Sequence, residues 1–292
     1  MLELLIEKTC TRYSPHIIDM NKLSNLTLRI IFGLIGAALV VSGVLYSEWT
    51  FFLLFGLICA LSLIEFFNLL HQSKMYINRS FAIASGILLF IVNYLIQNHT
   101  LSSRHYYSLI TFVFLLFLIE LFQTNANPFY RIANTFLGIL YIALPLALFS
   151  SSAFIHGGYD YTIVMGILLL LWANDIGGYI GGVSFGKHKL FERVSPKKTW
   201  EGSIGGAVFS LGIAWVCAYF FPNLSLVNWI VLSLIIIIFG SIGDLVESLF
   251  KRNLSVKDSG NLIPGHGGFL DRFDGLFIAS PFLLMYLKVF VS

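Results

Sequence analysis

Charged residues and glycines are concentrated in one segment near the C-terminal end, residues 248–274, with the sequence SLFKRNLSVKDSGNLIPGHGGFLDRFD. Directly before and within it, Asp244, Glu247 and Lys251 fall at i, i+3 and i+7, with Ser248 at i+4. These spacings place the side chains on one face of a helix. The pattern predicts a helix that presents a carboxylate and an ammonium group together.

A second pair of acids closes the segment. Asp271 and Asp274 are three residues apart and follow the glycine-rich turn PGHGG, so they can also share a helix face. Mg²⁺ takes oxygen ligands and is usually held by one or two carboxylates plus substrate phosphates. Two sets of carboxylates beside cations therefore favour a metal-bound phosphate over a solvated charge cluster. His266 has no Cys or His partner at zinc spacing. The cations beside these acids are Lys251, Arg252, Lys257 and Arg272.

An earlier polar stretch, residues 172–202, reads WANDIGGYIGGVSFGKHKLFERVSPKKTWEG. Its glycines suit close approach of helices or of a ligand. Ser195 followed by Pro196 is typical of an N-cap and first helical position, which predicts a helix beginning at Lys197 and Lys198. The N–H groups and ammonium groups of such a helix would suit a phosphate. The alternative is that the lysine pair only anchors the topology.

The elements that position these stretches must cross a membrane. Hydrophobic residues make up 57% of the 292 residues, charged residues only 11%, and the mean hydropathy is +0.84. Soluble domains carry about 25% charged residues. We predict an all-α, polytopic integral membrane bundle, because helices satisfy their own backbone in lipid. About nine runs approach the ~20 residues needed to cross. They are 28–46, 49–70, 80–97, 106–122, 131–150, 161–181, 204–221, 226–243 and 275–291.

The predicted organisation is a cytosolic tail, residues 1–27, followed by a single membrane domain, residues 28–292. With nine spans, every Lys and Arg except Arg104 and Lys288 lies on the N-terminal side. That side is cytoplasmic by the positive-inside rule. The two polar loops, 182–203 and 244–274, then both face the cytosol. The slight positive charge reflects this topology and an anionic substrate, with no case for nucleic acid.

Three further carboxylates lie inside predicted spans: Glu65, Glu120 and Asp175. Acids at this depth are expected to face the bundle interior or water. Glu65 is open to two interpretations, a structural hydrogen-bonded acid or a cavity lining. Glu120 either lines the interior or reaches the interface. Asp175 stands in polar, glycine-rich surroundings and is expected to contact substrate.

The two polar stretches resemble the characteristic sequences of the phosphatidate cytidylyltransferases, also called CDP-diacylglycerol synthases. The first match is S-x-F-K-R at 248–252, K-D at 257–258, Gly260, and H-G-G-F-x-D-R-F-D at 266–274. The second is D-x-x-G-Y at 175–179, G-K at 186–187, and S-P-K-K-T-W-E-G at 195–202. Gly178 departs from the pattern, which usually has alanine there. The resemblance covers roughly residues 130–290.

The resemblance implies the reaction CTP + phosphatidate → CDP-diacylglycerol + pyrophosphate at the cytosolic face of a membrane. It implies Mg²⁺ held by Asp244 and Asp271, with or without a second cation, and a homodimer. We expect Asp244, Asp271, Asp274 and Lys251 to be catalytic. The groups expected to bind substrate are Asp175, Lys197, Lys198, Arg252, Lys257, His266, Gly267, Gly268 and Arg272. The sequence leaves a bacterial inner membrane and an organellar membrane both open, and the compact length and short loops favour the bacterial one.

Two alternatives remain at this stage. A polyprenol or phytol kinase would also use CTP but would transfer the γ-phosphate to an alcohol. A transporter is less favoured, because transporters often carry paired broken helices in two halves. Here the polar material is confined to the second half of the chain.

Overall fold

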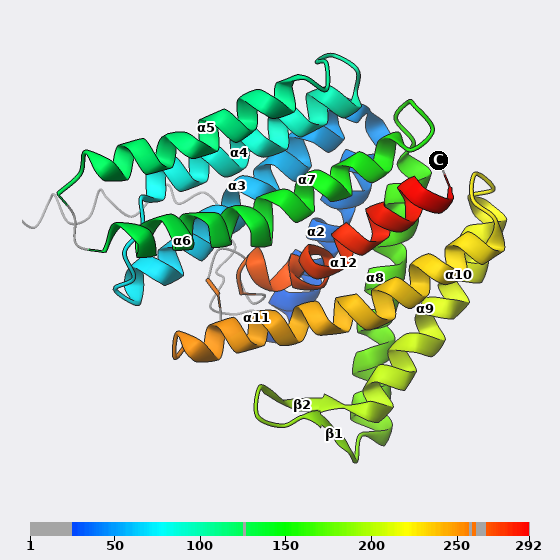
Figure 1. The fold of residues 1–292 in the computed structure, drawn as a ribbon. Coiled ribbons are helices and arrows are strands. Elements are labelled where there is room, and N and C mark those ends of the chain that lie inside the picture. Colours follow the sequence, from blue (N-terminus) through cyan, green and yellow to red (C-terminus); the bar gives the residue numbers. More distant parts are fainter. Residues whose placement is uncertain (1–24, 125–126, 257–258, 261–266, 292) are drawn as a thin grey trace, which may run out of the picture.

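The computed structural model describes residues 25–124, 127–256, 259–260 and 267–291 (Figure 1). It is almost entirely helical, which confirms the all-α prediction. The first half contains α2 (Asn25–Tyr46), α3 (Glu48–Gln72), α4 (Arg79–Gln97), α5 (His105–Leu121), α6 (Pro128–Gly138), η2 (Ile139–Ala143), α7 (Leu144–Ser151) and η3 (Ser152–Phe154). The second half contains α8 (Tyr161–Phe185), β1 (Lys189–Phe191), β2 (Ser195–Thr199), α9 (Trp200–Phe220), α10 (Leu226–Ile235), η4 (Ile236–Gly240), α11 (Ser241–Asn253) and α12 (Leu270–Phe290).

Seven helices in the described part of the chain are long and apolar enough to cross a membrane. Two of them, Pro128–Phe154 and Leu226–Asn253, run continuously through the π-helical segments η2 and η4. The other two predicted spans form shorter apolar helices, Ile31–Tyr46 and His105–Leu121. The chain is thus a polytopic helical membrane protein, while the count of nine spans stays a prediction.

Several connections and helix ends that carry basic residues lie toward one end of the bundle. Figure 1 shows the α3–α4 and α5–α6 connections, the β1–β2 hairpin and the C-terminal end of α11 there. The α4–α5, α7–α8 and α9–α10 connections and the C-terminus lie at the opposite end. This alternation agrees with the predicted segregation of charge.

Helices α8 and α9 pack with their backbones in direct contact, as the glycine pattern indicated. A Cβ at Gly205 would lie 2.6 Å from the carbonyl oxygen of Gly177, and a Cβ at Gly181 would lie 2.8 Å from that of Glu201. A methyl group at either position would force the two helices apart. The glycines of the WANDIGGYIGG stretch therefore bring α9 and the hairpin before it close to α8.

The prediction that Ser195 caps a helix beginning at Lys197 is wrong. Residues Ser195–Thr199 form β2, which pairs antiparallel with β1, and α9 begins at Trp200. Thr199 is the cap, because its Oγ1 accepts a hydrogen bond from the Gly202 N–H at 3.2 Å. Serine and threonine are both good N-cap residues, and strand pairing with β1 decided between them.

Candidate functional site

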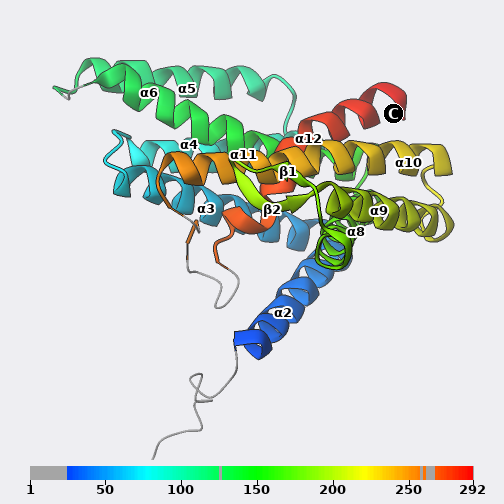
Figure 2. The ribbon, with the colours of Figure 1, turned by 90° about the horizontal axis from the view of Figure 1, so that it is seen from below.

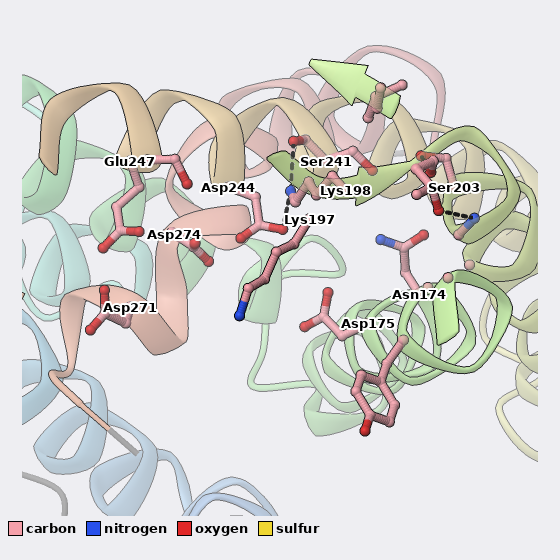
Figure 3. Close-up of a pocket in the computed structure, with 18 of the residues that line it drawn as sticks. Asn174, Asp175, Lys197, Lys198, Ser203, Ser241, Asp244, Glu247, Asp271 and Asp274 are labelled. Carbon is pink, nitrogen blue, oxygen red and sulfur yellow. Dashed lines mark hydrogen bonds and ion pairs between the residues drawn. The ribbon is translucent and has the colours of Figure 1, made fainter. Parts of the chain in front are cut away.

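A cavity of about 1130 Å³ opens between the hairpin and helices α8, α9, α11 and α12 (Figure 3). Both polar stretches of the sequence line it, although they are far apart along the chain. Nine of the predicted site residues contribute to its wall. They are Asp175, Lys197, Lys198, Asp244, Lys251, Gly267, Asp271, Arg272 and Asp274.

Helix α11 carries Asp244 without a break after the apolar part of its span. Residues 244–253 are therefore helical, and the polar loop begins later than expected. Asp244 forms an ion pair with Lys198 from the hairpin, and Lys198 Nζ also donates to the Ser241 carbonyl at 3.4 Å. The side chains of Lys198 and Asp244 are 27% and 41% exposed. Such exposed pairs contribute only about 0–1 kcal/mol, so little free energy holds Lys198 on Asp244.

Lys251 joins the two carboxylate-bearing helices. Its Nζ lies 2.6 Å from Glu247 Oε2, one turn back on α11, and 2.6 Å from Asp271 Oδ1 on α12. All three side chains are largely buried. Removing one partner of a buried pair typically costs about 3–5 kcal/mol, because an uncompensated charge remains. The helical face predicted from the i, i+3, i+7 spacing is confirmed, and Glu247 is part of it.

Asp271 lies in the first turn of α12 and organises the glycine-rich turn before it. Its Oδ2 accepts backbone N–H groups from Gly268 at 3.1 Å and Ser259 at 3.2 Å. Gly267 has φ +84°, a conformation that favours glycine. A Cβ there would also lie 2.8 Å from Asp271 Oδ2. The turn thus depends on glycine for both its backbone and its contact with Asp271.

Asp274, one turn further along α12, lies beside Asp244 in the cavity wall (Figure 3). Asp175 is exposed to the cavity from the α8 side, and Figure 3 shows it facing the acids of α11 and α12. The amine of Lys197 extends into the space between them (Figure 3). No ion pair of Lys197 is found among the described residues.

Four predicted substrate-binding residues are not placed in the cavity wall. Arg252 is exposed and does not line it, because each residue advances about 100° around an α-helix and Lys251 faces inward. Gly268 lies just behind the wall, where its N–H bonds to Asp271. Lys257 and His266 lie outside the described residues, as does the greater part of the predicted 1–27 tail.

The other intramembrane acids are buried. Glu120 forms an ion pair with Arg131 at 2.9 Å, which fastens α5 to α6 away from the cavity. Glu65 accepts a backbone hydrogen bond from the start of α12. Sequence reasoning did not find Asn174, Ser203 and Ser241, which also line the cavity. Isolated polar residues on apolar helices carry no spacing signal that would reveal them.

The donor set fits a hard divalent cation. Asp175, Asp244, Glu247, Asp271 and Asp274 give the described part of the wall five carboxylates against four cationic side chains, and Lys198 and Lys251 form ion pairs with these acids. Asp244 and Asp274 repel each other unless a proton or cation lies between them. Among the described residues, no three acid, imidazole or thiol groups gather closely enough to hold a metal by themselves. Phosphate oxygens from a substrate would complete its coordination, as is usual for Mg²⁺.

Comparison with known proteins gives consistent similarities. The sequence model described as "Cytidylyltransferase family" matches residues 27–290. A Staphylococcus haemolyticus protein named phosphatidate cytidylyltransferase is 40% identical over 178 residues, which is 60% of this chain and 66% of that protein. A Haemophilus influenzae protein of the same name is 45% identical over 125 residues, 41% of this chain and 43% of that protein. A Staphylococcus aureus relative, also so named, is 38% identical over 178 residues. These alignments span just under two thirds of their relatives at most.

Proposed function

The chain belongs to the cytidylyltransferase family, and we propose that it is a phosphatidate cytidylyltransferase, which converts CTP and phosphatidate to CDP-diacylglycerol and pyrophosphate. The observation that carries the proposal is the cavity between the hairpin, α11 and α12. It joins the two characteristic stretches and places Lys197, which forms no ion pair with the described residues, opposite a group of carboxylates. Relatives of this name supply the substrate class.

The reaction requires two polyanions to meet in line. A phosphate oxygen of phosphatidate attacks the α-phosphorus of CTP and forms a new P–O bond. The bond from the α-phosphorus to the oxygen of the β-phosphate breaks, and pyrophosphate leaves with that electron pair. The attacking phosphate is already ionised at neutral pH, so no general base is needed. The protein supplies alignment and positive charge.

The ion pairs that each lysine forms in the structure indicate its role in the reaction. Lys197 forms no ion pair within the part of the chain that the structure describes, so we expect it to meet an incoming triphosphate first. Lys198 follows by exchanging its exposed contact with Asp244 for a phosphate oxygen. Lys251 is already neutralised by Glu247 and Asp271, so its part is to hold α11 and α12 in register.

Asp244 and Asp271, with Asp274 beside them, are the residues proposed to hold Mg²⁺, alone or with a second cation. When bound there, the ion would neutralise charge on the α-phosphate and the leaving pyrophosphate. Lys198 and Lys251 now occupy the positions beside these acids. The lysines therefore offset the negative charge of these acids and hold their side chains in place.

The proposed setting is a bacterial inner membrane with the cavity facing the cytosol. The relatives are bacterial, and the basic connections lie toward the hairpin end of the bundle. Phosphatidate stays in the bilayer with its headgroup at the interface, while CTP arrives from water. A homodimer, which the family resemblance implies, is testable by light scattering of the purified protein in detergent.

The decisive experiment uses purified protein in detergent with phosphatidate and CTP labelled at either the α- or the γ-phosphate, with and without Mg²⁺. Label from α-labelled CTP is expected in the lipid, with pyrophosphate released. A lipid labelled only from γ-labelled CTP would show a lipid kinase and refute the proposal. Strict dependence of activity on sealed vesicles and a gradient would instead indicate transport.

A further inference from the structure

Glu65 lies in the first half of the chain but contacts the second-half site. We propose that it is a positioning residue for the reaction proposed above: it holds Gly260, Gly268 and the start of α12, and so fixes Asp271. This role rests on the proposed function and adds a residue that neither characteristic stretch contains.

The direct contact is a hydrogen bond across 205 positions of sequence. Glu65 Oε2 accepts the Leu270 N–H at 2.9 Å, and Leu270 is the residue before Asp271. Glu65 is only 3% exposed. The first N–H groups of a helix have no partner within the helix, and a negative group there is favoured by the helix dipole. Glu65 therefore serves as a cap for α12 that comes from another helix.

The turn is shaped to fit this carboxylate. A Cβ at Gly260 would lie 2.7 Å from Glu65 Oε1, and a Cβ at Gly268 would overlap Glu65 Oε2. Both glycines thus leave space that Glu65 fills. Gly260 and Gly268 therefore lie directly against the acid.

Asp271 binds the same turn from a different direction. Its Oδ2 accepts the N–H groups of Ser259 and Gly268, while the Cα of Gly268 faces Glu65. Gly268 is therefore held between the two carboxylates. If Gly268 shifted away from Glu65, Asp271 would lose hydrogen bonds. Its carboxylate would then be held less firmly beside Lys251.

Helix α3 supports both carboxylate helices around this point. Phe66 stacks on Phe250 of α11 with ring centroids 4.8 Å apart and planes 13° apart. Phe55 meets Phe273 of α12 edge-on, at 6.4 Å between centroids. Figure 2 shows the start of α12 beside α3. Glu65 lies on a helix that is itself packed against α11 and α12, so its carboxylate can fix the position of the start of α12.

The test compares Glu65→Ala and Glu65→Gln with Glu120→Ala as a matched control. Glu120 is equally buried, at 3% exposure, but its partner is Arg131 on α6. For each variant, kcat and KM for both substrates are measured per folded molecule, together with Tm. E65A is expected to lower kcat about 100-fold with both KM values within about threefold, because Asp271 acts on the transition state. E65Q, which keeps an oxygen for Leu270, should remain within about fivefold of the wild-type kcat.

The control E120A should lower Tm without changing kcat. A folded E65A protein with the kcat of E120A would overturn the proposal, as would a loss in E65Q as large as in E65A. Where E65A does not fold, Glu65→Asp replaces it. Aspartate is one methylene shorter and should lower kcat about tenfold at unchanged KM, so a wild-type kcat would again overturn the role. If the wild-type protein makes no CDP-lipid, the proposed function itself fails, which is a different outcome.

Discussion

Replacing Asp271 by asparagine is the change that probes the site most directly. Among the described residues, Asp271 accepts hydrogen bonds from Lys251 Nζ at 2.6 Å, from Gly268 N at 3.1 Å and from Ser259 N at 3.2 Å. An asparagine has one acceptor oxygen and an amide group that can only donate. Whichever way it turns, the amide faces either the lysine or the two backbone N–H groups. The substitution thus breaks either the contact with Lys251 or the contacts with the two backbone N–H groups, while hardly changing the volume of the side chain.

The size of the effect follows from these contacts. Hydrogen bonds to charged groups contribute about 1.5–3 kcal/mol each. If the variant loses one to two of them where Asp271 acts, the barrier rises by about 1.5–6 kcal/mol, which is roughly 10- to 10⁴-fold in kcat. Loss of a proposed metal ligand acts in the same direction. We expect a folded, membrane-inserted protein with kcat lowered by about 10³-fold.

The assay is incorporation of α-labelled CTP into lipid by purified protein, over a range of Mg²⁺ concentrations. Asp160→Asn is a matched control. Asp160 also accepts a backbone N–H at a helix start, from Thr162 at 2.9 Å, but it lies in the α7–α8 connection at the opposite end of the bundle. D160N should keep the wild-type kcat. Wild-type turnover by folded D271N would refute the reasoning and remove Asp271 from the reaction.

Three further predictions follow from single contacts. Lys197→Ala should raise KM for CTP about tenfold, which corresponds to the loss of one hydrogen bond to a charged group. The control Lys189→Ala, on the exposed side of the hairpin, should leave this KM unchanged. Equal KM values for the two variants would exclude Lys197 from nucleotide binding. Gly268→Ala should abolish activity, because the added Cβ would overlap the Glu65 carboxylate. The control Gly212→Ala, whose Cβ would meet nothing within 4 Å, should be neutral. An active G268A protein would contradict the packing of Gly268 against Glu65. Burial raises the pKa of Asp160, but hydrogen bonds to its carboxylate outweigh this and hold the pKa below the ordinary 3.8. The stability that the Asp160 carboxylate contributes should be complete above about pH 4 and be lost as the pH falls through its lower folded-state pKa. D160N should therefore flatten the pH dependence of Tm below about pH 4. An unchanged slope would count against this linkage.

The amino-acid sequence by itself determined the class of the fold and the local parts of the site. Low charge and long apolar runs require membrane helices, because no other open structure satisfies its backbone in lipid. The spacing of Asp244, Glu247 and Lys251 required one helical face, and Lys251 does pair with Glu247 one turn away. These predictions held because α-helical geometry fixes which near neighbours in sequence meet.

Only the tertiary structure decided which distant groups meet. Ser195 and Thr199 are equally plausible caps, and pairing with β1 settled the choice for Thr199. The contacts of Lys198 with Asp244, and of Lys251 with Asp271, depend on how α11 lies against the hairpin and α12. Glu65 could be identified as an interior acid, but its partner is 205 residues away. Spacing along one helix carries no information on the packing between helices, and that packing builds the cavity.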